Sequence, residues 1–294
     1  MSRLVSVIIP SYKRSDTVIR ALNSVLNQTY EDIEVLVVDD NIQGDEYSIE
    51  LEKVLGQIND NRVILIRQEK HVNGAKARNE GVKASHGDYI AFLDDDDEWW
   101  PDKIERQIHI LEKNPEYSGI AGGVTLWKDN KEISQLPLKK ISSENLLYKV
   151  LIREVGLATS SFLCTKSSFE NIGGFDETLK RSQDLQLFAD YLCQYKIYPI
   201  WDFRTTKMHV ESSINRLNSH ALSKNKSDFF RSIQDVLGTF SKSKQRRIKS
   251  AHYYEICFVA LKESDYLFAL KNFIRGLKSP CSLFDLGKRM LERI

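Results

Sequence analysis

Four consecutive aspartates, Asp94–Asp97, directly follow the apolar stretch Tyr89–Leu93, and this feature constrains the fold most strongly. Adjacent carboxylates repel one another, so a folded protein keeps such a run where a cation or a helix end offsets the charge. The apolar stretch is typical of a buried β-strand. In open α/β sheets, ligands bind at the carboxyl ends of the strands. Because Mg²⁺ and Mn²⁺ prefer carboxylate oxygens, the run predicts a divalent-cation site at this edge of a sheet.

Other interpretations of this acidic run have to be considered. The aspartates can form a solvated surface segment, or they can cap a helix that begins at Pro101. A calcium-binding helix-loop-helix would use Asp94 and Asp96 at ligand spacing. However, Trp99 occupies the position that needs glycine and Pro101 interrupts the loop, so we reject the calcium loop. The first two interpretations stay open at this point.

Strand-like and helix-like segments alternate along the first part of the chain. The expected strands are 4–9, 33–38, 62–66 and 89–93, and the expected helices follow Ser15 or Asp16 and span 46–58 and 75–85. A helix at 102–113, a strand around 120–127, a helix at 185–195 and strands at 197–201 and 205–210 follow. This alternation predicts an α/β fold with a mostly parallel central sheet flanked by helices. Asp39 and Asp40 close the second strand, so they should reach the same edge as the acidic run.

Length and composition indicate a globular protein. The chain has 294 residues, of which 41% are hydrophobic and 28% charged, enough for one large domain or a main domain with a smaller one. The N-terminus carries no signal-peptide pattern, and no apolar run is long enough for a membrane span. Four widely scattered cysteines indicate reduced thiols. We therefore expect a cytoplasmic protein.

Charge is distributed unevenly along the sequence. Residues 216–294 hold 16 Lys and Arg against 7 Asp and Glu, a net charge of +9, and the remaining residues carry −8. We expect a domain boundary here, with a first domain at 1–212 and a basic α-helical C-terminal region at 213–294. The last helix of this region, near 283–294, is expected to be amphipathic. A basic helical region of this kind can contact anionic lipid or nucleic acid, and basic solvated helix faces are also common in proteins that touch neither. We expect no nucleic-acid partner.

Glycine-rich phosphate loops are missing from the sequence after the first expected strand. Neither the GxGxxG pattern of dinucleotide-binding proteins nor the P-loop pattern occurs there. Phosphate charge must therefore be balanced by a metal and by side chains. This excludes most dehydrogenases of the Rossmann type and the P-loop kinases.

Four segments together resemble a known family. VSVIIPSYKR, VLVVDDN, NGAKARNEGVKASHGDYIAFLDDDDEWWPDKIERQ and NIGGFDETLKRSQDLQLF have the order and spacing of the inverting glycosyltransferases of family 2. The resemblance covers residues 4–210. It implies a GT-A fold, a nucleotide-sugar donor, a divalent cation (Mn²⁺ or Mg²⁺) and transfer with inversion at the anomeric carbon.

The resemblance assigns one group of residues to the nucleotide-sugar. These are Pro10, Ser11 and Tyr12 in the loop against the base, Asp39 at the uracil, Arg78 beside the nucleotide, and Asp94 and Asp95 towards ribose and diphosphate. Without the resemblance, Tyr12 can be ordinary packing, Asp39 can cap a turn and Arg78 can lie on a helix surface.

The resemblance also implies a metal site and a catalytic base. Asp96 matches the preferred metal ligand, with Asp94 beside it, and His209 is a weaker match to a histidine that approaches the metal or the diphosphate. Asp184 matches the carboxylate that takes the acceptor proton. The alternatives are a carboxylate favoured by a helix dipole for Asp184 and a hydrogen-bonded, non-ligand histidine for His209.

Two positions depart from the usual family pattern. Gln183 stands where Glu often precedes the base, which removes a charge beside Asp184. Arg14 stands where many members carry Glu, which indicates a subgroup of the family.

We therefore expect a metal-dependent glycosyltransferase. It should move a hexosyl or N-acetylhexosaminyl group from a UDP-sugar to a glycan or lipid-linked acceptor, in surface or capsular polysaccharide synthesis. The basic C-terminal region would then hold the enzyme peripherally at the inner face of the cell membrane. One rival class, the sugar-phosphate nucleotidyltransferases, would need a glycine-rich loop after the first strand. The alternative that stays open is a non-catalytic module that binds a nucleotide-sugar or a glycan.

Overall fold

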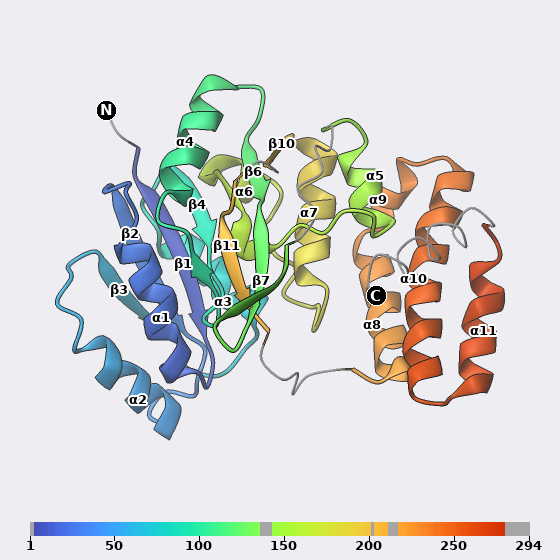
Figure 1. Ribbon diagram of the computed structural model, residues 1–294, viewed down its shortest axis with the longest axis horizontal. Helices are drawn as coiled ribbons and strands as arrows, with labels where there is room; N and C mark the ends of the chain where they lie inside the picture. Colours follow the sequence, from blue (N-terminus) through green and yellow to red (C-terminus); the bar gives the residue numbers. More distant parts are fainter. Residues whose placement is uncertain (1–2, 136–142, 201–202, 211–216, 280–294) are drawn as a thin grey trace. The chain divides into compact units, whose positions relative to one another are not determined.

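The computed structural model describes residues 3–135, 143–200, 203–210 and 217–279 (Figure 1). The chain divides into two compact units. The first comprises 1–143, 157–177 and 194–212, and the second comprises 144–156, 178–193 and 213–294. The second unit therefore contains two segments that the sequence alone assigned to the first domain.

The first unit is built on a seven-stranded sheet with the order β10-β6-β9-β4-β1-β2-β3. Its strands are β1 (Val5–Ser11), β2 (Ile33–Asp39), β3 (Val63–Arg67), β4 (Tyr89–Phe92), β6 (Gly119–Gly122), β9 (Leu163–Thr165) and β10 (Ile197–Ile200). The first four strands pair in parallel, β10 is parallel to β6, and β9 is antiparallel to both of its neighbours. This arrangement confirms the predicted mostly parallel α/β sheet.

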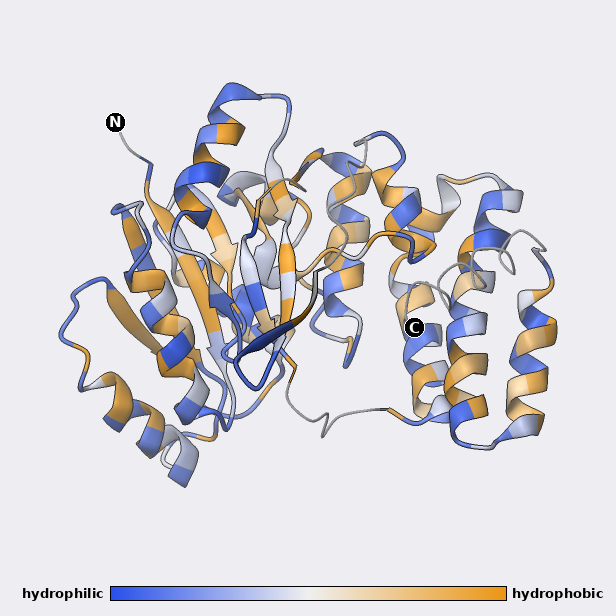
Figure 2. Cartoon of the chain, in the orientation of Figure 1, coloured by the Kyte–Doolittle hydropathy of each residue, from blue (hydrophilic) through white to orange (hydrophobic). Residues whose placement is uncertain are grey.

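Helices cover this sheet because its strands are apolar on both faces, as Figure 2 shows for β1 and β2. The helices of the first unit are α1 (Ser15–Leu26), α2 (Glu46–Leu55), α3 (Gly74–Ala84), α4 (Lys103–Lys113) and α6 (Lys166–Asn171). Asp45 caps α2 and Asn73 caps α3 by accepting a backbone N–H three residues on. At Gly81 a Cβ would lie 2.5 Å from the Ile8 side chain, so glycine lets α3 pack tightly on β1.

A pair of glycines divides the strand that we expected around 120–127. β6 ends at Gly122, and β7 (Val124–Lys128) belongs to another sheet. Gly122 and Gly123 have φ angles of +134° and +68°, and a Cβ on them would collide with the carbonyl oxygens of Ile200 and Phe203, respectively. The expectation of one continuous strand was wrong because this backbone, which glycine alone tolerates, redirects the chain.

The second sheet has four strands in the order β5-β11-β7-β8. Besides β7 they are β5 (Glu98–Trp99), β8 (Lys131–Gln135) and β11 (Thr206–His209). β5 directly follows the acidic run and pairs antiparallel with β11, with Lys207 opposite Glu98. This pairing places Thr206 and Lys207, near the start of the expected strand 205–210, beside the residues that directly follow the acidic run.

The second unit is helical, which confirms the predicted C-terminal helical extension. Its helices are α5 (Leu146–Leu151), α7 (Gln183–Gln194, of which the last residue belongs to the first unit), α8 (Ser219–Ser232), α9 (Gln234–Gly238), α10 (Lys242–Lys262) and α11 (Tyr266–Gly276). The amphipathic helix expected near 283–294 lies outside the described residues. Among the helices that are described, none is long and apolar enough to cross a bilayer.

An ion pair between the buried Lys226 and the half-buried Glu255 joins α8 to α10 within the second unit. Lys226 Nζ lies 3.0 Å from Glu255 Oε2, and Arg153 Nε lies 3.9 Å from the same oxygen. Burial alone would raise the pKa of Glu255, but the charges of Lys226 and Arg153 outweigh it and lower this pKa to about 2. Burial lowers the pKa of Lys226, against the attraction of Glu255. The pair therefore depends on both charges being present.

We expect Glu255→Gln to destabilise the protein at pH 7 by about 1–2 kcal/mol, because it leaves Lys226 buried without its counter-charge and solvent partly screens the pair. The pKa of Glu255 is lower in the folded chain than in the unfolded chain. Its contribution to stability is therefore complete above about pH 4.5 and is lost as the pH falls towards 2. Urea unfolding followed by circular dichroism should show a difference in unfolding free energy between variant and wild type that shrinks as the pH falls over this range.

Glu50→Gln, which breaks the exposed pair with Lys53, is the matched control and should have little effect on the unfolding free energy. An equal effect of the two substitutions would contradict this account.

Candidate cation and nucleotide site

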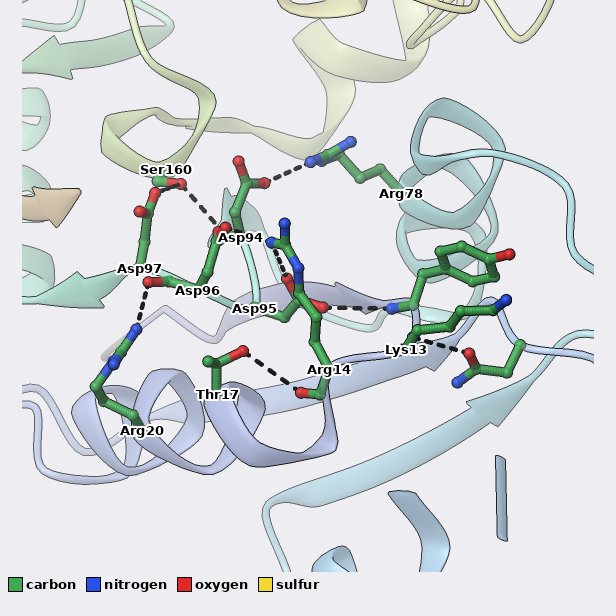
Figure 3. A network of polar contacts seen from close by, with 12 residues as sticks. Lys13, Arg14, Thr17, Arg20, Arg78, Asp94, Asp95, Asp96, Asp97 and Ser160 are labelled. Atoms are coloured by element: carbon green, nitrogen blue, oxygen red, sulfur yellow. Dashed lines mark hydrogen bonds and ion pairs between the residues drawn. The ribbon is translucent and has the colours of Figure 1, made fainter. Parts of the chain in front are cut away.

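A cluster of carboxylates follows the central strand β4. Oxygen atoms of Asp94, Asp96 and Asp97 lie within 4.8 Å of one another, close enough to share one metal ion. Asp95 turns away from this group and accepts the backbone N–H of Tyr12 at 3.3 Å (Figure 3). The sequence placed Asp94 and Asp96 at the metal but did not single out Asp97. Three hard oxygen donors fit Mg²⁺ or Mn²⁺.

Three arginines from other elements balance part of this charge. Arg14 pairs with Asp96 and, at 3.1 Å, with Asp95, and Arg78 of α3 pairs with Asp94 (Figure 3). Arg20 of α1 donates from Nη2 to the backbone carbonyl of Asp96 at 2.7 Å. Arg14, which the sequence marked as a departure from the family pattern, is therefore a direct partner of the carboxylates.

Burial makes the ionised form of the clustered carboxylates less favourable, which raises their pKa values. It raises the pKa of Asp95 to about 7, although the Arg14 charge opposes this shift. Burial also raises the pKa of Asp97 well above its ordinary range, and the charge of Asp94 adds to the effect. A divalent cation bound here would offset both the cost of burying these charges and the repulsion between them.

Ser160 supports the cluster from a distant segment. It lies in the short 3₁₀ helix η1 (Thr159–Ser161), and its Oγ donates to Asp97 Oδ2 at 2.6 Å while accepting the Asp94 N–H at 3.2 Å. Its carbonyl accepts Trp99 Nε1–H at 2.6 Å and the Thr206 hydroxyl at 2.9 Å. These bonds fix the Asp97 carboxylate and the backbone of Asp94, and no motif in the sequence pointed to Ser160.

His209 lies beside the cluster and contacts another carboxylate. Its Nε2 is 2.6 Å from Glu98 Oε1, and its backbone N–H bonds the Asp97 side chain. Lys207 and Arg20 also pair with Glu98, at 3.5 and 3.6 Å. In this structure the imidazole is thus oriented by Glu98, and its expected role at the metal stays a prediction.

The carboxyl end of β2 holds Asp39 rigidly. Its Oδ1 accepts from the backbone and the side-chain amide of Asn41, at 3.0 and 2.7 Å, and its Oδ2 accepts from the Ser48 hydroxyl at 2.6 Å. The neighbouring Asp40 accepts Val72 N–H and pairs with His71, so it orders the loop after β3. Asp39 is 2% exposed, which suits a fixed acceptor rather than a surface charge.

The loop after β1 supplies an open aromatic surface. Pro10 lies within β1, and Tyr12 follows this strand with 38% of its surface exposed and stacks on His71 at 4.0 Å. The buried Ser11 Oγ lacks a hydrogen-bond partner within the described chain. Arg78 packs over the Phe175 ring at 5.5 Å, which directs its guanidinium to Asp94. The first unit thus brings together all the residues that the resemblance assigned to the nucleotide.

Asp184 belongs to the second unit. It lies in the first turn of α7, where its exposed carboxylate faces the positive end of the helix dipole. The preceding Ser182 has a φ of +62°, and Gln183 Nε2 donates to the Leu179 carbonyl at 2.6 Å. Asp184 therefore lies at the start of α7, next to a residue whose side chain is hydrogen-bonded to the preceding turn.

Together the sheet and the carboxylate cluster define an α/β protein with three carboxylates at the carboxyl edge of its strands that could hold a cation. The family model described as glycosyl transferase family 2 matches residues 6–173, more than half of the chain. The chain belongs to this family, as the sequence motifs predicted.

Relatives and solved structures agree with this assignment. Over 269 residues the chain is 29% identical to the UDP-Glc:alpha-D-GlcNAc-diphosphoundecaprenol beta-1,3-glucosyltransferase WfgD of Escherichia coli, covering 92% of this chain and 97% of WfgD. It is 29% identical to the amylovoran biosynthesis glycosyltransferase AmsB of Erwinia amylovora, over 62% of each chain. The S. aureus TarS 1-349 structure superposes with a TM-score of 0.65 at 17% identity, covering 93% of this chain and 80% of TarS. This likeness confirms the predicted GT-A fold.

We expect Ser160→Ala to weaken Mn²⁺ binding about tenfold, because it removes the hydrogen bond to Asp97. Loss of a hydrogen bond to a metal-binding side chain typically lowers metal affinity by about this factor. Titration of Mn²⁺ followed by electron paramagnetic resonance measures the change directly. Ser85→Ala is the matched control, since Ser85 is also buried and donates only to the Val82 carbonyl. Unchanged Mn²⁺ affinity in Ser160→Ala would show that Ser160 does not position the carboxylates.

Proposed function

We propose that this protein transfers a sugar from a UDP-sugar to a lipid-linked saccharide diphosphate, with inversion at the anomeric carbon and with the help of a divalent cation. The observation that carries the proposal is the cluster of Asp94, Asp96 and Asp97 at the carboxyl end of β4, beside the rigid Asp39. WfgD is named for UDP-glucose and a GlcNAc-diphosphoundecaprenol acceptor, and TarS 1-349 was solved with UDP-GlcNAc. These names favour UDP as the nucleotide.

The nucleotide would lie over the ends of β1 and β2. Asp39 would accept the imide N–H of uracil, because its carboxylate is held in place and buried. Tyr12, with Pro10 and Ser11 before it, would pack against the base. Asp94 and Asp95 would face ribose and diphosphate, and Arg78 would bond a diphosphate oxygen.

Asp94, Asp96 and Asp97 would hold the cation, Mn²⁺ or Mg²⁺. A cation bound there supplies positive charge that stabilises the departing nucleoside diphosphate. Arg14 and Arg78 neutralise the cluster now, so they would exchange part of their pairing with the carboxylates for pairing with phosphate. His209 stays a candidate for the same region, held by Glu98.

Asp184 would act as the catalytic base. The acceptor hydroxyl oxygen attacks the anomeric carbon, the bond from this carbon to the diphosphate oxygen breaks, and Asp184 takes the hydroxyl proton. An exposed carboxylate in the first turn of a helix is accessible to an acceptor hydroxyl, which suits this role. With Gln183 rather than Glu before it, Asp184 has no neighbouring like charge from that position.

The acceptor implies a place for the reaction. A lipid-linked diphosphate lies in a membrane, so the protein would work peripherally at the inner face of the cell membrane. The sugar assembled there would enter a surface polysaccharide, which agrees with the amylovoran biosynthesis named for AmsB.

We expect Asp184→Asn to lower the rate of transfer by about 10²–10⁴-fold while leaving UDP-sugar affinity unchanged, because the amide cannot take the proton. Transfer from UDP-glucose and UDP-GlcNAc to a synthetic GlcNAc-diphospholipid measures the rate, and calorimetry measures donor binding. Asp235→Asn, another exposed carboxylate in the first turn of a helix of the second unit, is the matched control. Full activity of Asp184→Asn would refute the assignment. Donor binding without transfer by the wild type to any saccharide acceptor would favour a non-catalytic binding module instead.

A further inference from the structure

Helix α11 and the residue after it expose five large apolar side chains. The exposed fractions are 69% for Tyr266, 81% for Leu267, 55% for Leu270, 57% for Ile274 and 42% for Leu277, which follows the helix directly. At about 100° per residue, these five side chains fall within one stripe about 100° wide. We call these five residues the α11 ridge, and Figure 2 shows the hydrophobic residues along this helix.

The other side of α11 packs on α10 through small residues and through two half-buried aromatic side chains, Phe268 and Phe273. Ala269, Asn272 and Gly276 are buried, and a Cβ on Gly276 would lie 2.5 Å from the Tyr254 ring. Ala269 joins Cys257 and Ala260 of α10 in one apolar cluster. The large aliphatic side chains of the ridge are therefore not what holds α11 in the fold.

Such a concentration of exposed apolar side chains indicates a binding surface. Elsewhere in the described chain, large exposed hydrophobic residues are spread over several elements: Tyr12, Ile42, Ile49, Ile133, Val210 and, in α10, Leu261. Single exposed residues of that kind are normal on protein surfaces, whereas a contiguous stripe marks an interaction site.

The charges around the ridge identify the kind of partner. The segment 266–279 contains Lys271, Arg275 and Lys278 and no acidic residue. Lys271 and Lys278 are exposed and follow the edge of the ridge by helical periodicity. A second copy of this chain would bring like charges together, whereas an anionic lipid surface complements both the cations and the apolar stripe.

We propose that the α11 ridge inserts into the headgroup region of an anionic bilayer, with Lys271 and Lys278 against lipid phosphates. This inference deepens the proposed function, on which it rests for the lipid-linked acceptor, by naming the surface that meets the membrane. It also narrows the membrane contact expected of the basic C-terminal region, 213–294, to one described helix within it.

Co-sedimentation of the full chain with vesicles tests the proposal without donor or acceptor, so its failure is separate from failure of the transfer reaction. The wild type should bind vesicles that contain phosphatidylglycerol and bind pure phosphatidylcholine weakly. Leu267→Asp with Leu270→Asp should lower the partition coefficient at least about tenfold. Lys271→Gln with Lys278→Gln should lower it severalfold at low salt and less at high salt. Ile49→Asp, at a position with 58% exposure on α2, is the matched control and should bind like the wild type.

Unchanged vesicle binding by the ridge variant, with circular dichroism as a check of folding, would overturn the proposal. If vesicle binding were lost only on substitution of Leu291 and Ile294, the proposal would also be overturned. The end of the chain would then be the part that contacts the membrane. Self-association in analytical ultracentrifugation that the ridge substitutions abolish would show that the ridge binds a second copy.

Discussion

Burial of several carboxylates after β4 is the constraint on which the rest of the first unit depends. β4 lies between β1 and β9, and all four of its residues are buried, so the turn that follows is confined to the edge of the sheet. Charges at such a place are costly unless they are paired. Arg14, Arg20 and Arg78 come from the loop after β1, from α1 and from α3 to meet them. Three separate elements are thus held together by one group of negative charges.

A second layer of polar contacts makes this arrangement rigid. Lys103 is fully buried, lies 3.8 Å from the centroid of the Trp99 ring and donates to Gln107 at 2.8 Å. Gln107 in turn donates to the Ser161 carbonyl at 2.9 Å, which ties α4 to the same 3₁₀ turn that carries Ser160. Buried hydrogen-bonded networks of this kind fix a single geometry, which a site for a cation and a diphosphate requires.

Local patterns in the sequence predicted much of this architecture. Apolar runs and helical periodicity identified β1 to β4 and the helices between them, because these signals reside in neighbouring residues. We predicted that Asp39 and the acidic run lie at the same edge of the sheet, because parallel strands have their carboxyl ends at one edge. The position of Asp97 as the third carboxylate did not follow, since the four aspartates look alike until the turn orients them.

Features that depend on distant segments escaped prediction. Ser160 contacts Asp97 across 63 positions of sequence, and nothing in its own surroundings marks it. The division at Gly122 and Gly123 depends on the carbonyl groups of Ile200 and Phe203, which approach only in the folded chain. Likewise, segments 144–156 and 178–193 join the helical unit through tertiary contacts rather than through composition.

The central claim is that the carboxylates after β4 bind a cation together with a nucleoside diphosphate. Calorimetric titration of UDP into the protein with Mn²⁺ and then with EDTA tests it most directly. The account predicts binding that is at least tenfold weaker in EDTA, with this dependence lost in Asp96→Asn. Equal UDP affinity with and without the cation would contradict it.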